Sequence, residues 1–118
     1  MKHALLAIVL GASTLAITQS TDPLLASGLT LLEEGRTTLE EKPLTDARDF
    51  FAQLTQKDAN NAIAFYQLAR ADSYLLESYA HHGNKKNAEH TLDDAIAAAQ
   101  RSIELNDKSA DAHSLLAG

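Results

Sequence analysis

LTQKDANNAIAFYQLA, residues 54–69, aligns without a gap on SIELNDKSADAHSLLA, residues 102–117. Each stretch runs from the end of a helix-like segment through a polar turn into a second helix-like segment. This offset of 48 residues keeps small and apolar residues in register. The matched positions are Ala62, Ala64, Leu68 and Ala69 against Ala110, Ala112, Leu116 and Ala117. The same offset places Ala47 on Ala95. We therefore expect an internal repeat built from pairs of helices.

The rest of the chain from Asp22 onward is also rich in helix-forming residues and has no alternating β-branched run of the kind that strands show. The sequence therefore predicts an all-α protein. Asp22 can cap a helix that begins at Pro23, and Pro43 interrupts the apolar pattern. Thr45 or Asp46 can cap the next helix, and Asn60 or Asn61 the one after it. Gly83 can take the left-handed conformation that ends helices. The expected helices span residues 23–41, 46–57, about 61–81 and 87–105, the last with an apolar face formed by Leu92, Ala95, Ile96, Ala99 and Ile103.

The repeat has a recognisable order of residue types. Phe65, Leu68 and Ala69 supply an aromatic, a leucine and a small residue, and Ala47 stands four residues before Phe51 in the preceding helix. In this order the chain resembles the tetratricopeptide repeat (TPR) family, which has the first set in its first helix and a small residue four before an aromatic in its second. The resemblance implies a right-handed α-α superhelix of TPR-like helical hairpins, with about two repeats and the start of a third.

The chain matches the family pattern at some further positions and departs from it at others. Leu31 and Gly35 stand where an earlier first helix would have its aromatic and its glycine. Asp72 replaces a usual tyrosine, Ala99 an aromatic and Asp107 a proline. The repeat from Ala69 to Ala117 is also longer than the family's, by roughly four helical turns, which is about two turns in each of two helices. We therefore expect a lengthened second hairpin.

Residues 1–20 have a composition of their own. Met1-Lys2-His3 is a short basic start, ALLAIVLGASTLAI is apolar, and TQS closes the segment with small and polar residues. This pattern predicts a secretory signal peptide over residues 1–20, cleaved between 16 and 20, and a helical domain over 21–118. The apolar run is shorter than the ~20 residues of a membrane-spanning helix. We expect a periplasmic or secreted protein without a stable membrane anchor after cleavage.

Charge and chemistry narrow the function classes. Removal of residues 1–20 takes away one lysine and no acid, which leaves nine basic and sixteen acidic residues and a net charge of −7. This charge disfavours nucleic acid and anionic membranes as partners. His81, His82 and His90 form the one cluster that suggests a metal, but their spacing matches no metal motif, and the chain has no cysteine. We expect no catalytic site and no cofactor.

A binding surface is the remaining possibility. In tetratricopeptide proteins, first-helix residues that face away from the partner helix line the binding groove. The resemblance therefore implies that Arg36, Tyr66, Arg70 and Tyr74 bind a protein or peptide. Tyr66, Arg70 and Tyr74 are spaced i, i+4 and i+8, and arginine and tyrosine often dominate the energy of interfaces. The alternative is structural: both tyrosines pack against a neighbouring helix pair, and Arg70 pairs with Glu77 or Asp72.

Two functional hypotheses follow. The first is an exported interaction scaffold without catalysis, whose groove binds a protein or peptide. The second is a periplasmic small-molecule carrier or transport accessory, with a pocket between the long helices lined by Leu75, Leu76, Tyr79 and Leu92. Residues 109–118 begin a third first helix by the register, so we also expect the chain to be the N-terminal portion of a longer repeat protein or the product of a gene that has lost its remainder.

Overall fold

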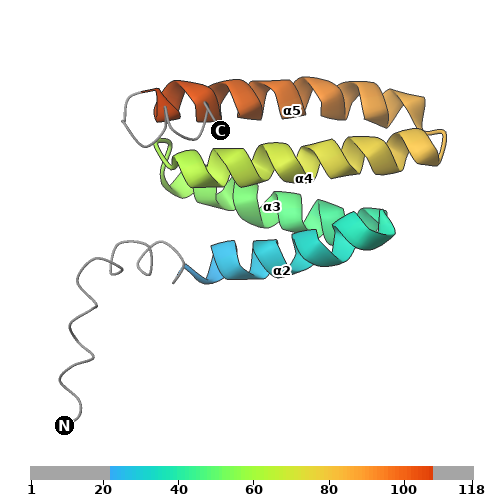
Figure 1. The fold of residues 1–118 in the computed structure, drawn as a ribbon, viewed down its shortest axis with the longest axis horizontal. Helices are drawn as coiled ribbons and strands as arrows, with labels where there is room; N and C mark the ends of the chain where they lie inside the picture. Colours follow the sequence, from blue (N-terminus) through green and yellow to red (C-terminus); the bar gives the residue numbers. More distant parts are fainter. Residues whose placement is uncertain (1–21, 108–118) are drawn as a thin grey trace, which may run out of the picture.

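The computed structural model describes residues 22–107, which fold into four helices and no strand (Figure 1). The predicted all-α fold is confirmed for these residues. The predicted signal peptide and the predicted start of a third helix pair lie outside them. The helices are α2 (Pro23–Thr38), α3 (Glu41–Lys57), α4 (Ala62–His81) and α5 (Lys85–Asn106).

The first helix begins where the sequence predicts. A carboxylate oxygen of Asp22 accepts a hydrogen bond from the backbone N–H of Leu24 at 2.9 Å, and Pro23 is the first helical residue. The helix ends at Thr38 and not at residue 41, because Leu39 takes a left-handed conformation (φ 58°). Its N–H donates to the carbonyl oxygen of Gly35, which closes the last turn.

The second helix begins five residues before its predicted start at Asp46. Pro43 was expected to end the preceding segment, but it is the third residue of α3 and is buried. The first N–H groups of a helix have no acceptor within it, so a proline in the first turn removes no hydrogen bond. Asp46 does not cap the helix; it accepts a hydrogen bond from Lys42 at 2.8 Å within the first turns.

The caps of the two long helices confirm the predicted turn residues. The side chain of Asn61 accepts a hydrogen bond from the N–H of Ala64 at 3.0 Å, which fixes the start of α4. Gly83 has φ +75°, a conformation that glycine adopts readily. The side chain of Asn84 then accepts from the N–H of Asn87, so α5 begins two residues before the predicted position.

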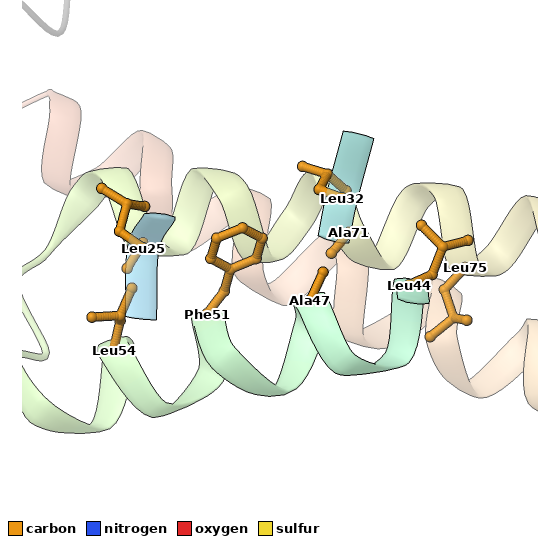
Figure 2. Packing of buried hydrophobic residues seen from close by; sticks show 9 residues of the cluster. Leu25, Leu32, Leu44, Ala47, Phe51, Leu54, Ala71 and Leu75 are labelled. Carbon is orange, nitrogen blue, oxygen red and sulfur yellow. The ribbon is translucent and has the colours of Figure 1, made fainter. Parts of the chain in front are cut away.

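The helices pack as two consecutive pairs. The helix α2 lies on α3, the helix α4 lies on α5, and α4 also contacts α3 and α2 (Figure 1). The main core lies between the first pair and α4, and its buried apolar residues are Leu25, Leu32, Leu44, Ala47, Phe51, Leu54, Ala64, Ala71 and Leu75. Figure 2 shows Ala47, Phe51 and Leu54 on the same side of α3. Phe51 packs so closely on α2 that a Cβ atom at Gly28 would lie 2.5 Å from its ring.

The helix α5 buries a different face from the one the sequence predicts. Its buried residues are small or polar: Thr91, Ala95, Ala98 and Ser102. Of the predicted face only Ala95 is buried, while Leu92, Ile96 and Ile103 are 44–47 % exposed. Among the described helices, α5 approaches only α4, and small residues allow the two backbones to lie close together. The larger apolar side chains therefore flank the contact and face outward.

Candidate interaction surface

The four predicted binding residues lie on α2 and α4. Arg36 donates a hydrogen bond to Glu33 at 2.9 Å on the exposed side of α2. This bond lowers the pKa of the Glu33 carboxyl, and the charge of Arg70 lowers it further. The pKa of Arg36 is raised mainly by Glu33 and to a smaller degree by Tyr74. The structure thus brings Arg36 near Tyr74, and Arg70 near Glu33.

Tyr66, Arg70 and Tyr74 form a stripe along α4, and their side chains are not equally exposed. Tyr66 is 53 % exposed, whereas Tyr74 is half-buried and packs against the core. The guanidinium of Arg70 donates to the neutral side-chain oxygen of Gln67 at 2.9 Å, not to the acids Glu77 or Asp72 that the structural alternative names. The structural alternative therefore applies to Tyr74, while Tyr66 and Arg70 remain able to contact a partner.

A groove lies beside this stripe, between α4 and α5, and we call it the α4–α5 groove. Its volume is about 500 Å³. Apolar side chains dominate its lining, and Tyr66 and Arg70 stand among them; the full set is Ala62, Ile63, Tyr66, Ala69, Arg70, Ser73, Ala99, Ser102, Ile103 and Asn106. The sequence pattern predicted the tyrosine and the arginine but not the groove.

The two helix pairs differ at positions that line this groove. In the first pair Phe51 fills the space beside Gly28. The offset that carries Ala47 onto Ala95 puts Ala99 at the place of Phe51. The alignment of the two first helices that sets Leu31 on Phe65 also sets Gly28 on Ala62. Two alanines face a space that an aromatic ring fills in the first pair, so the space stays open.

A second hollow surrounds a buried acid. It has a volume of about 460 Å³ and is lined by Arg48, Asp49, Ala52, Phe65, Leu68, Asp72, Asp94, Ala97 and Ala98. Asp72 is 2 % exposed, and its Oδ1 atom has no hydrogen-bond partner among the described residues. Burial raises the pKa of Asp72 from its ordinary 3.8 to about 7; the charge of Arg48 opposes the rise, and that of Asp94 adds to it.

The histidines and the carrier hypothesis can also be placed on the structure. The rings of His81 and His82 meet edge to face at 5.3 Å, and Nδ1 of His82 lies 2.8 Å from the carbonyl oxygen of Ser78. Residues 22–107 contain no group of three or more histidines and acids that could hold a metal ion. Of the residues named for the carrier pocket, Leu75 is fully buried in the core, whereas Leu92 is 44 % exposed.

Comparison with known proteins identifies no relative of this chain. No family model matches the chain, and neither a curated protein nor a solved structure is significantly similar to it. None of the helices within residues 22–107 combines the length and the apolar character that a membrane span requires.

Proposed function

We propose that the chain is an exported, TPR-like interaction scaffold that binds another protein or a peptide and catalyses no reaction. In this proposal α2 and α4 are the first helices of two hairpins in a right-handed superhelix, and their residues line the binding groove of the stack. Arg36, Tyr66, Arg70 and Tyr74 contact the partner.

The observation that carries the proposal is that the Tyr66 ring is exposed and that Arg70 donates its hydrogen bond to a neutral side chain. Tyr66 presents an aromatic ring that is 53 % exposed, one helical turn from Arg70. Arg70 has a neutral hydrogen-bond acceptor in Gln67, whereas Arg36 and Arg101 donate to carboxylates. A carboxylate on a partner would give Arg70 a stronger, charge-assisted bond. We therefore expect the partner to present an acidic side chain or a chain terminus next to an apolar one.

Affinity capture from the exported fraction tests this proposal. The mature protein is compared with a Tyr66→Ala/Arg70→Ala/Tyr74→Ala variant, and the captured proteins are quantified by mass spectrometry. The proposal predicts at least one protein that wild type captures and the variant loses. Because Tyr74 also packs against the core, the Tyr66→Ala/Arg70→Ala double variant separates the loss of binding from any loss of fold.

A matched control uses the solvent-facing side of α5. Lys86, His90 and Asp93 are exposed and lie on one side of that helix. A Lys86→Ala/His90→Ala/Asp93→Ala variant changes the same number of side chains and should capture the same proteins as wild type. An unchanged captured set in the double and triple variants of α4, or an equal loss in the α5 control, would refute the assignment of the binding surface.

A further inference from the structure

The hollow around Asp72, which we call the Asp72 hollow, lies where α3 and α5 each pack on α4. Within residues 22–107 the helix α4 lies between α3 and α5, which do not contact each other (Figure 1). The volume of the hollow, about 460 Å³, is in the range of small-molecule sites. Each helix contributes neighbouring residues of its surface: Arg48, Asp49 and Ala52 from α3, Phe65, Leu68 and Asp72 from α4, and Asp94, Ala97 and Ala98 from α5. None of them lines the α4–α5 groove, so a ligand in the Asp72 hollow leaves Tyr66 and Arg70 accessible.

Asp72 is the only ionisable side chain of this hollow that is buried. It is 2 % exposed, and no residue within 22–107 donates a hydrogen bond to its Oδ1 atom. The charge of Arg48 acts on the pKa of Asp72, but the Arg48 guanidinium donates to Asp49, at 3.2 Å. Burial of a carboxylate without a donor or a paired charge is costly. A positively charged donor that enters the hollow would offset this cost.

The charges that line the hollow favour a cation as the ligand. The acids Asp49, Asp72 and Asp94 accompany one arginine, Arg48, which is already paired with Asp49. Asp94 is exposed on α5 and forms no ion pair with any described residue. An anion would therefore meet an excess of negative charge. The acids do not suit a metal ion either, because residues 22–107 contain no group of three or more acids and histidines that could hold one.

We propose that the Asp72 hollow binds a small primary amine in its ammonium form. The ammonium group donates to Oδ1 of Asp72, and Asp94 attracts the same charge from α5. Phe65 and Leu68 contact the short apolar part of the amine, for which the alanines of α3 and α5 leave room. A free alkylamine and the lysine side chain of another protein present this same chemistry. The site is separate from the α4–α5 groove and does not rest on the proposed function.

Binding of an amine at this site should depend on the ionisation of Asp72. Burial raises the pKa of this carboxyl to about 7; the charge of Arg48, which is paired with Asp49, opposes the rise, and that of Asp94 adds to it. An alkylamine has a pKa near that of lysine, about 10.4, so it stays charged from pH 6 to pH 8. Over this range the ionised fraction of Asp72 rises from about 0.09 to about 0.91. The apparent affinity for the amine should therefore rise about tenfold.

NMR titration of the full, isotope-labelled chain with n-butylammonium chloride tests the proposal. At pH 8 the amide resonances of Phe65, Leu68 and Ala98 should shift and reach saturation, and the dissociation constant should be about tenfold higher at pH 6. n-Butanol, which has the same apolar chain and no charge, should produce no saturable shift. Asp72→Asn should lose the dependence on pH and bind the amine at pH 8 no more tightly than wild type does at pH 6. Asp93→Asn, at an exposed position of α5 outside the hollow, should match wild type.

A second probe separates the two sources of the ammonium group. Nα-acetyl-lysine N-methylamide presents a lysine side chain as a protein does. Binding of both probes supports a site for partner lysines as well as free amines, and binding of n-butylammonium alone supports a site for free amines. The comparison of n-butylammonium with n-butanol in wild type needs no substitution, so it remains decisive if Asp72→Asn does not fold. Absence of saturable shifts with n-butylammonium at pH 8, equal shifts with n-butanol, or equal affinity in wild type and Asp72→Asn would overturn the proposal.

Discussion

Replacement of Asp72 by asparagine should make the protein less sensitive to pH. The carboxyl is 2 % exposed, its Oδ1 atom lacks a partner among the described residues, and its pKa is about 7. Asparagine has nearly the size of a protonated aspartic acid and stays neutral at every pH. The substitution therefore removes the ionisation of this site and keeps its packing.

The direction of the effect follows from the two pKa values. In the unfolded chain Asp72 loses its proton near 3.8, and in the native protein near 7. Between these values the native state binds more protons than the unfolded state, so this group's contribution to stability falls as pH rises. The contribution is fully present below pH 3.8 and is lost as pH passes 7. About three pKa units correspond to about 4 kcal/mol in total, of which about 2.5 kcal/mol is lost between pH 5 and 8.

Urea unfolding of wild type and Asp72→Asn at pH 5 and pH 8 measures this quantity. The free energy of unfolding of the variant, relative to wild type, should rise by about 2.5 kcal/mol between the two pH values. Asp93→Asn, at an exposed position on α5, should show no such rise. If the difference between wild type and Asp72→Asn is the same at both pH values, the native carboxyl titrates normally and the account of its burial is wrong.

Three further substitutions test the packing and the caps, each by urea unfolding. Gly28→Ala should destabilise the fold by about 1–3 kcal/mol, since the new Cβ would lie 2.5 Å from the Phe51 ring; a more stable variant would show that the ring moves aside. Ser78→Ala should lower the free energy of unfolding by about 1–2 kcal/mol, because its hydroxyl donates at 2.6 Å to the carbonyl oxygen of Leu39; no change would mean that water replaces the bond. Asn61→Ala should remove about 1 kcal/mol with the cap of α4, and equal stability would contradict that role.

The parts of the fold that depend on local chemistry could be predicted from the sequence. Asp22 with Pro23, Asn61 and Gly83 mark helix ends through their own hydrogen bonds or backbone freedom, and the structure confirms all of them. Pro43 was misleading because the same residue can end one helix or stand in the first turn of the next. In the structure Pro43 is buried in the first turn of α3, and a local pattern does not contain that information.

The candidate interaction surface could not be predicted from local sequence alone, because it depends on which helices pack against one another. The apolar spacing on α5 predicted one apolar face, but it could not show that α4 contacts the small residues beside it and leaves Ile103 exposed. The alanine at position 99 was the available signal for the groove, since it departs from the aromatic of the first pair. Asp72 likewise departed from the repeat pattern, but a local pattern could not show that this carboxyl is buried or that the charges of Arg48 on α3 and Asp94 on α5 act on its pKa.

Site-specific photo-cross-linking tests most directly whether the stripe on α4 contacts a partner. A benzophenone amino acid replaces Tyr66 or Arg70, and in a control it replaces His90 on the exposed side of α5. After irradiation of cells that produce the protein, we predict that the same protein is cross-linked from positions 66 and 70 and not from 90. Cross-linking of equal yield from all three positions, or none above background from 66 and 70, would contradict the proposed interaction surface.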